Sequence, residues 1–311
     1  MKNNKIILKL GSSFILFIFL LIIKNYFFYV LNIDLNNLTN NMNIILNIIY
    51  VIASGLITLI FYMHLKNKDN LNSYLKTFYL GIGAVSVYFV MNEIAALPLI
   101  LLGINVATMP TVIKAIYLLS YEIIMLAIIY SILKDKINLA IIDIKKNHKE
   151  YFSKYFKYWL LALIIMSSSN ILIGLINGGQ IAGNEEAVRN TFDQAPIYMF
   201  ISAVIIAPLT EEFIFRQALR NIFSNNKVFI VISGLVFGGL HVVSSVSGWT
   251  DLLYLIPYCT PGFIFAYILV KSNNIFVSTG LHFLHNGIMM SLQILLLLLG
   301  QMWSSFFVFI Y

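Results

Sequence analysis

Long apolar stretches separated by short polar segments dominate the hydrophobic pattern of this 311-residue chain. Most run for about 18 to 25 residues, which is the length that an α-helix needs to cross a bilayer. We therefore predict an all-α fold, a polytopic transmembrane helical bundle of about nine spans, with eight to ten compatible with the pattern. The expected spans are residues 10–32, 43–63, 77–103, 111–133, 158–177, 195–216, 228–246, 252–270 and 275–298.

Composition and charge support a membrane protein and give it an orientation. The chain is 60% hydrophobic and only 11% charged, which excludes an ordinary soluble domain. The net charge of +7 comes from lysines in alternate connectors, seven of them between residues 134 and 157. This alternation predicts a multi-pass cell-membrane protein with a cytoplasmic N-terminus, whose lysines meet membrane lipids. Because the basic residues follow topology, we expect no nucleic-acid partner.

Three parts of the chain are expected to differ in role. Residues 1–177 form an N-terminal transmembrane region of unassigned role, opening with a retained signal anchor because no small-residue cleavage site follows its first apolar run. Residues 178–300 hold the polar groups described next. Residues 301–311 are too short to span and are rich in aromatic residues, which is typical of an interfacial tail.

Charged and imidazole side chains occur inside three of the later spans. Glu211 and Glu212, followed by Arg216, stand in the span at 195–216. An ionised carboxylate at bilayer depth costs several kcal/mol or more, so two in succession indicate a functional site. His241 lies in the span at 228–246, and the last span contains His282, His285 and Asn286.

Spacing places these groups in a common layer and pairs them on helix faces. At about 1.5 Å per residue, Glu211, His241 and His282 lie about 13, 21 and 12 Å from the cytoplasmic ends of their helices. Glu212 and Arg216 are four residues apart and share a face, as do Phe237 and His241, and His282 and Asn286. We expect these groups to meet in one cavity.

Two kinds of chemistry fit such a set. A carboxylate and a histidine can activate water for peptide-bond hydrolysis, while a second histidine and an amide stabilise the oxyanion. Glu211, His241 and His282 are also proper zinc ligands, and zinc would activate water as well. At this point the residues leave both alternatives open.

The order Glu211-Glu212-x-x-x-Arg216, Phe237-x-x-x-His241 and His282-x-x-x-Asn286 resembles the CPBP family of intramembrane endopeptidases. This family comprises CAAX proteases and bacteriocin-processing or self-immunity proteins, and it includes the type II CAAX prenyl endopeptidases. The resemblance covers about 95 residues, from 196 to 290, and makes 178–300 the expected catalytic membrane domain.

The resemblance implies a role for each position. Glu211 activates water with His241, and His282 and Asn286 form the oxyanion site. Glu212 is structural and held by Arg216, with Phe237 in support. The family has been described both as glutamate proteases and as metalloproteases, so the expected cofactor is either none or zinc.

Several questions of function stay open at the level of sequence. The expected partner is a peptide or protein substrate: a CAAX-type tail, a bacteriocin or pheromone leader, or a membrane protein. One alternative is a non-catalytic bacteriocin-immunity or regulatory membrane scaffold, and another is a proton-coupled transporter, which the absence of an internal repeat disfavours. Oligomeric state is not predicted.

Other polar residues receive less specific interpretations. We expect His285 to serve packing or supporting hydrogen bonds, and Cys259 to be a small core residue. Glu93 and Glu122 stand in apolar spans, where they pair with Lys114 or line the cavity. The acidic segment that contains Glu185 and Glu186 is expected to be a solvated loop.

Overall fold

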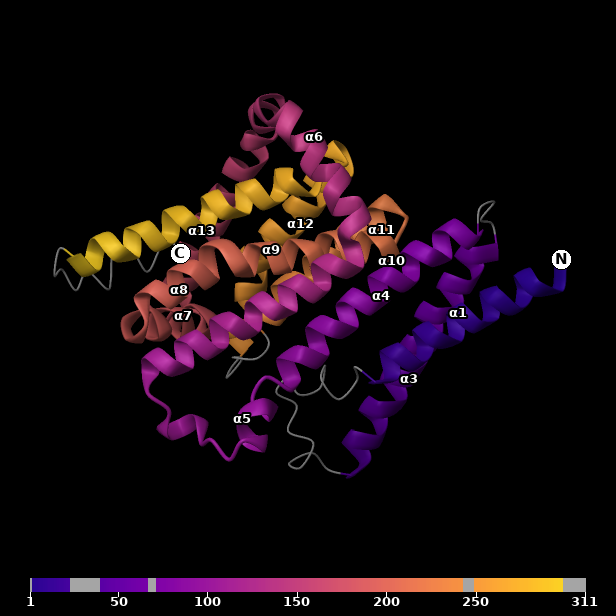
Figure 1. Ribbon diagram of the computed structural model, residues 1–311, viewed down its shortest axis with the longest axis horizontal. Coiled ribbons are helices and arrows are strands. Elements are labelled where there is room, and N and C mark those ends of the chain that lie inside the picture. The colour runs from indigo at the N-terminus through magenta and orange to yellow at the C-terminus, as the bar shows by residue number, and fades with distance from the viewer. Residues whose placement is uncertain (1, 23–39, 67–70, 243–248, 299–311) are drawn as a thin grey trace. The chain divides into compact units, whose positions relative to one another are not determined.

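A computed structural model describes residues 2–22, 40–66, 71–242 and 249–298 (Figure 1). Every regular element within these ranges is a helix, which confirms the predicted all-α class. Four of these helices are long and apolar enough to cross a membrane: Leu71–Glu93, Thr111–Ile176, Pro196–Ile222 and Trp249–Ser272. Shorter apolar helices accompany them in the described part of the chain. The molecule is therefore a helical membrane bundle, while the count of nine spans stays a prediction.

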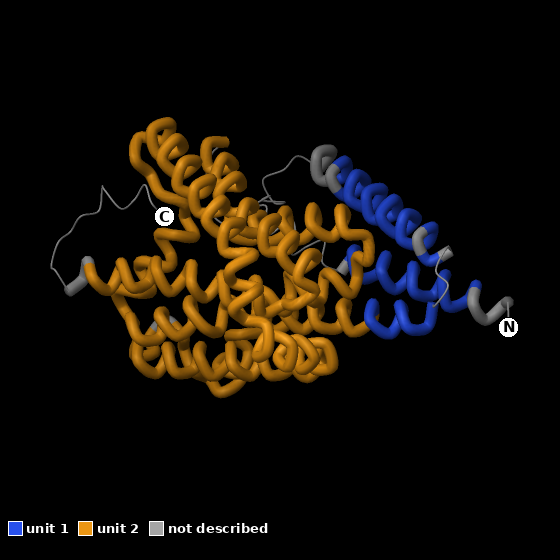
Figure 2. The backbone as a smooth tube through the Cα atoms, turned by 90° about the horizontal axis from the view of Figure 1, so that it is seen from above, with its two compact units in different colours: residues 1–78, 243–246 blue, residues 79–242, 247–311 orange. Residues whose placement is uncertain are grey.

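The described residues separate into two compact units, one up to residue 78 and one from residue 79 onward (Figure 2). The first unit contains α1 (Lys2–Ile22), α3 (Asn40–Lys66) and the start of α4 (Leu71–Glu93). Within it, the Tyr50 hydroxyl donates to the carbonyl of Leu20 at 2.7 Å. Phe61 stacks on Phe78 with ring centroids 4.5 Å apart. The expected boundary at residues 177/178 stays a prediction, and the tail 301–311 lies outside the described residues.

The second unit holds the rest of α4 and every later helix. Its elements are α5 (Leu97–Leu101), η1 (Val106–Thr108), α6 (Thr111–Ile176), α7 (Gly183–Gln194), α8 (Pro196–Ile201), η2 (Ser202–Ile206), α9 (Ala207–Glu211), η3 (Glu212–Ala218), α10 (Leu219–Ile222), α11 (Asn226–Val242), η5 (Trp249–Tyr254), α12 (Leu255–Ser272) and α13 (Ile275–Leu298).

One predicted span needs correction, and two predicted span ends cannot be assessed. The stretch 77–103 is not one helix, because α4 ends at Glu93 and α5 begins at Leu97, with Pro98 in its first turn. Proline cannot donate the backbone hydrogen bond that would continue a helix through this point. The predicted ends at residues 32 and 246 lie outside the described residues.

Helix α6 contains both the fourth and the fifth predicted spans and the connector between them. It cannot be straight. Glu122 accepts a hydrogen bond from Ser202, which lines the same cavity as Asn170. Glu122 and Asn170 would be about 70 Å apart along a straight helix. The helix therefore turns back on itself, and its two arms correspond to the two predicted spans.

The lysine-rich middle of α6 is helical because it is amphipathic. Ile137 and Tyr155 are buried there, while most of the lysines are on the exposed side. The buried Asn274, at the start of α13, donates to Asp143 at 2.7 Å and to the carbonyl of Ala140 at 2.9 Å. Its own side-chain oxygen accepts the backbone N–H of Phe276 at 2.9 Å. This asparagine thus begins α13 and binds it to α6.

The segment Pro196–Ile222 departs twice from regular α-helix. Residues 202–206 and 212–218 form π-helical turns on either side of Pro208. Because Pro208 has no N–H, the i→i−4 ladder is interrupted next to it, and the preceding turn widens so that the Ala207 N–H reaches the Ser202 carbonyl. Such π-helical turns are frequent at functional sites.

Glycines let α11 approach α12 very closely. A Cβ atom added to Gly238 would lie 2.3 Å from Cys259 Sγ and 2.6 Å from the Cys259 backbone nitrogen. A Cβ on Gly262 would lie 2.8 Å from the Cα of Gly234. Gly234 and Gly238 are four residues apart on α11, and Cys259 is the small buried residue that the sequence predicts, here at the contact. This contact sets the position of His241 relative to α12.

Candidate active site

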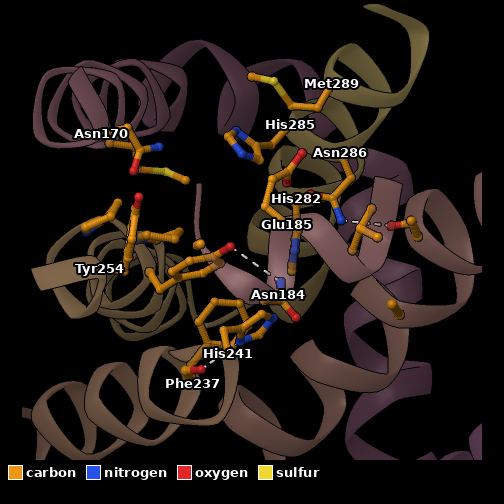
Figure 3. A pocket seen from close by; sticks show the side chains of 18 of the residues that line it. Asn170, Asn184, Glu185, Phe237, His241, Tyr254, His282, His285, Asn286 and Met289 are labelled. Atoms are coloured by element: carbon orange, nitrogen blue, oxygen red, sulfur yellow. Dashed lines mark hydrogen bonds between the residues drawn. The ribbon is translucent and has the colours of Figure 1, made fainter. Parts of the chain in front are cut away.

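A cavity of about 280 Å³ opens inside the second unit. It is walled by α6, α7, α8, η2, α9, α11, η5, α12 and α13 (Figure 3). Its lining combines methionines and other apolar side chains with a small group of polar ones, which is the usual composition of a substrate site. The polar lining side chains are Asn170, Gln180, Asn184, Glu185, Ser202, Glu211, His241, Tyr254, Tyr258, His282, His285 and Asn286.

Glu211 lies between two histidines from different helices. Its Oε1 is 3.8 Å from Nε2 of His241 on α11, and its Oε2 is 3.6 Å from Nε2 of His282 on α13. Both separations exceed a direct hydrogen bond, so the carboxylate retains capacity to bind water. The Glu211 side chain is 18% exposed, and it lines the cavity. The structure thus brings together the carboxylate and the two histidines that the sequence singles out.

The tautomer of His241 follows from its hydrogen bond within α11. Its Nδ1 lies 2.8 Å from the carbonyl oxygen of Phe237, one turn earlier. A carbonyl only accepts, so we assign the proton to Nδ1. In the neutral ring, Nε2 then carries a lone pair and faces Glu211. This nitrogen is placed to accept a hydrogen bond from water at the carboxylate.

His282 contacts both carboxylates. Its Nδ1 lies 3.2 Å from Oε1 of Glu212, and its Nε2 faces Glu211. Because a carboxylate oxygen only accepts, a proton on Nδ1 is donated to Glu212, while Nε2 faces Glu211. The ring also packs on Phe265, with centroids 5.2 Å apart. His282 therefore connects the carboxylate in the cavity with the one behind it.

Glu212 and Arg216 form a fully buried ion pair, each with 0% side-chain exposure. The contact runs from Arg216 Nε to Glu212 Oε1 at 3.4 Å. It is a single contact, not the two-pronged clamp that a guanidinium can form with a carboxylate. The guanidinium instead lies over the Phe237 ring, 4.4 Å from its centroid. The aromatic ring thus gives the buried cation a second favourable contact.

Asn286 and His285 occupy neighbouring positions on the cavity wall (Figure 3). Asn286 Nδ2 donates to the carbonyl of Ala203, in the first π-helical turn, at 2.8 Å. That bond uses one of the two amide hydrogens and leaves the second. The π-helical turn therefore has a direct part in orienting Asn286. His285 lines the cavity, and no role in the chemistry is assigned to it.

The acidic segment before residue 196 is not a solvated loop, so that expectation is wrong. Residues 183–194 form α7, and the Glu185 side chain is only 13% exposed and lines the cavity. Glu185 Oε1 accepts from Arg189 Nε at 2.6 Å. Burial raises the pKa of the Glu185 carboxyl, and the neighbouring Arg189 opposes that effect. The i,i+4 spacing of Glu185 and Arg189 is the signal in the sequence that favours a helix here.

Tyr258 and Glu122 also adjoin the site, although the sequence offers no motif for either. Tyr258 stacks on the His241 ring, with centroids 5.4 Å apart and an interplanar angle of 19°. Glu122 on α6 accepts hydrogen bonds from Tyr198 at 2.7 Å and from the cavity-lining Ser202 at 2.8 Å. Glu93 stands at the exposed end of α4. Glu122 thus supports the first π-helical turn from behind.

The three side chains named as possible zinc ligands, Glu211, His241 and His282, all line the cavity. In the part of the chain that the structure describes, no three His, Cys, Asp or Glu side chains are grouped so as to hold a metal ion. A carboxylate between two imidazoles can activate water without a metal ion, and Glu211 lies between His241 and His282 in that way.

Comparison with known proteins finds a family match over part of the chain. Residues 193–288 match the family model described as type II CAAX prenyl endopeptidase Rce1-like, and this segment contains every site residue predicted above. The membrane-embedded CAAX protease MroQ of Staphylococcus aureus is 29% identical over 157 residues, covering 46% of this chain and 60% of MroQ. The UPF0177 protein YxdF of Lactococcus lactis is 29% identical over 132 residues, covering 40% of this chain and 70% of YxdF.

A further relative is a candidate membrane peptidase of Bacillus subtilis, YdiL, which is 26% identical over 119 residues. That match covers 37% of this chain and 45% of YdiL, so the chain spans less than half the length of this relative. No solved structure matches the chain.

Proposed function

We propose that this chain, whose residues 193–288 carry the type II CAAX prenyl endopeptidase Rce1-like domain, is an integral membrane endopeptidase that uses Glu211 and His241 to activate water. One observation carries the proposal. The Glu211 carboxylate faces Nε2 of both His241 and His282, at 3.8 and 3.6 Å, on the wall of a cavity large enough for a peptide side chain and the bond beside it.

Water activation follows from the orientation of the two bases. A water between Glu211 and His241 donates one hydrogen bond to the carboxylate and the other to the Nε2 lone pair. As the water oxygen attacks the peptide carbonyl carbon, its proton passes to Glu211. The protonated Glu211 then delivers that proton to the amide nitrogen as the C–N bond breaks. The products are a new carboxyl terminus and a new amino terminus, and the carboxylate is regenerated.

His282 and Asn286 are proposed to stabilise the oxyanion formed by this attack. The imidazolium form of His282 has an N–H at Nε2, and Asn286 has one amide hydrogen beyond the one bound by Ala203. The two side chains are four residues apart on α13, and both line the cavity. Donors held in this way need little reorganisation when charge develops on the substrate oxygen.

The buried ion pair is proposed to hold the site in shape. Glu212 binds Nδ1 of His282, and Arg216 neutralises Glu212 while packing on Phe237. Phe237 in turn provides the carbonyl that binds His241. Glu212 and Arg216 thus support both histidines without lining the cavity themselves.

The proposed substrate is a peptide or protein that reaches the cavity from the membrane. The relative from Staphylococcus aureus is named as a CAAX protease, and a CAAX-type tail is one candidate substrate class here. A bacteriocin or pheromone leader and a terminal segment of a membrane protein are the others. We propose a multi-pass cell-membrane location with a cytoplasmic N-terminus, from the distribution of lysines.

Quantitative mapping of protein termini tests the function and identifies the substrate together. Membranes are compared from cells that express wild type, Glu211→Ala or Glu186→Ala at matched levels. Glu186 is an exposed carboxylate on α7 and provides the matched control. We expect new termini with wild type and Glu186→Ala that are absent with Glu211→Ala. Identical termini in all three membranes would instead favour a non-catalytic scaffold.

A further inference from the structure

The His241 ring is held by aromatic side chains packed against it as well as by the hydrogen bond at its Nδ1. The Tyr258 ring, from α12, lies nearly parallel to the imidazole, with ring centroids 5.4 Å apart and an interplanar angle of 19°. The Phe237 ring is tilted against the imidazole by 42°, with centroids 4.5 Å apart. The bond from Nδ1 to the Phe237 carbonyl holds one edge of the ring. Packing against a flat neighbour limits rotation about the Cβ–Cγ bond. Together these two contacts set the direction in which Nε2 points, which is toward Glu211.

Tyr258 is held in turn by α7. Asn184 Nδ2 donates to the Tyr258 hydroxyl at 3.4 Å, as the dashed line in Figure 3 shows. Phe192 of α7 is buried, with 1% exposure, and the ion pair of Glu185 and Arg189 stabilises the helix from within. It is polar and lies outside the candidate spans. A chain of contacts therefore runs from α7, through Tyr258, to the histidine beside Glu211.

We propose that Tyr258 is a positioning residue for His241 and that Asn184 couples α7 to it. The inference rests on the proposed function, because it assumes that His241 Nε2 orients the attacking water. Tyr258 gains and loses no proton in this role; it keeps the imidazole in the plane in which Nε2 faces Glu211. Its loss therefore lowers kcat more than it raises KM, which a residue that only contacts substrate would not do.

The test uses purified protein in detergent and a quenched fluorescent peptide that spans the cleavage site found by terminus mapping. We expect Tyr258→Leu to lower kcat about 10- to 100-fold with KM changed less than about 3-fold, because misplacing a catalytic group by a fraction of an ångström is costly. Tyr258→Phe keeps the ring and restores most of the activity. We expect Asn184→Ala to lower kcat as much as Tyr258→Phe does. The double variant Asn184→Ala/Tyr258→Phe should lose no more activity than either single variant, because both substitutions remove the same hydrogen bond.

Tyr267→Leu is the matched control. Tyr267 belongs to the same helix as Tyr258 and packs on Tyr158, with ring centroids 5.3 Å apart. It does not line the cavity, so we expect the kcat of Tyr267→Leu to stay near the wild-type value. The inference is overturned by a wild-type kcat in Tyr258→Leu, by an equal loss in Tyr267→Leu, or by an effect on KM alone. If Tyr258→Leu does not fold, the double-variant comparison decides, and additive losses overturn the coupling to α7. Activity in Glu211→Ala would instead refute the proposed function itself.

Discussion

His282 Nδ1 lies 3.2 Å from Oε1 of Glu212, so the histidine expected at the oxyanion site is bound to the carboxylate expected to be structural. The two adjacent glutamates are therefore linked through one imidazole ring, since the other nitrogen of His282 faces Glu211 at 3.6 Å. Changes at Glu211 and Glu212 should consequently have different effects, although the side chains are identical.

Glu211→Gln should abolish catalysis without harming the fold. The amide cannot accept a proton from water, and general-base catalysis contributes about 100- to 10,000-fold to a rate. The side chain is partly exposed in the cavity, so its neutralisation leaves no buried cation without a partner. The measurement is kcat on the mapped peptide together with the thermal unfolding temperature in detergent. A Glu211→Gln variant with more than a tenth of wild-type kcat would contradict the role of base.

Glu212→Gln should instead destabilise the protein. Glu212 is the carboxylate paired with the fully buried Arg216, and removing one partner of such a pair costs about 3 to 5 kcal/mol. We expect a clear fall in unfolding temperature, and a loss of activity that follows the loss of folded protein. Glu186→Gln, which changes an exposed glutamate, serves as the control. An unchanged unfolding temperature in Glu212→Gln would show that the pair does not stabilise the fold.

Arg216→Lys should also be harmful, although it preserves the charge. The planar guanidinium lies 4.4 Å from the centre of Phe237, and a lysine ammonium cannot present a flat face to that ring. A loss of about 1 to 2 kcal/mol, the range of a desolvated cation–π contact, is the expected size. Thermal unfolding of wild type and Arg216→Lys in the same detergent measures it. Equal stability of the two proteins would mean that charge alone matters at this position.

Gly238→Ala and Gly239→Ala should differ sharply, although the two glycines are adjacent. A Cβ at Gly238 would overlap Cys259, including its backbone, whereas a Cβ at Gly239 would have no neighbour within 4 Å. We expect Gly238→Ala to cost about 1 to 3 kcal/mol by overpacking, and to lower activity by separating α11 from α12. Unfolding temperature and kcat of both variants check this. Similar behaviour of the two variants would argue against the close helix contact.

Glu185 should make stability depend on pH. Its carboxyl pKa is raised above the ordinary 4.5 by burial, so the folded protein binds its proton more tightly than the unfolded chain does. The contribution of Glu185 to stability therefore falls as pH rises from about 4.5 through the higher folded pKa. As pH rises over this range, the unfolding temperature of Glu185→Gln should increase relative to that of wild type. A difference that is constant with pH would contradict the shifted pKa.

Chelation should leave activity unchanged. The proposed route activates water with Glu211 and His241 and uses no metal ion. Purified protein is treated with a strong zinc chelator, desalted and assayed on the mapped peptide. Activity that is lost on chelation and regained with added Zn²⁺ would show that a metal belongs to the reaction, and that Glu211, His241 and His282 rearrange to bind it.

Helical periodicity and depth in the membrane, both of which follow from the sequence, predict a large part of this protein. An apolar stretch of about 20 residues must be helical in lipid, because every backbone polar group has to be satisfied within its own segment. Charged or imidazole groups inside such stretches are too costly to be incidental, which singles out Glu211, His241 and His282. Four-residue spacing places Glu212 beside Arg216 by geometry alone. These conclusions depend only on neighbours along the chain.

Other features depend on contacts between segments far apart in sequence. His282 faces Glu211 and Glu212, which lie 71 and 70 residues earlier in the chain. This arrangement depends on how α13 crosses the π-helical segment. Helix α7 forms one wall of the cavity, to which Asn184 and Glu185 contribute. The position of this wall depends on where α6 turns back and where α12 places Tyr258.

The sequence by itself thus determined the helical membrane bundle and the set of candidate reactive side chains, because both follow from local hydrophobicity and spacing. Only the tertiary structure decided which carboxylate meets which histidine, and which apparently solvent-facing residues enter the site. The physical reason is that helix crossings are set by side-chain packing between segments, such as Gly238 against Cys259, and a single helix carries no record of its partner.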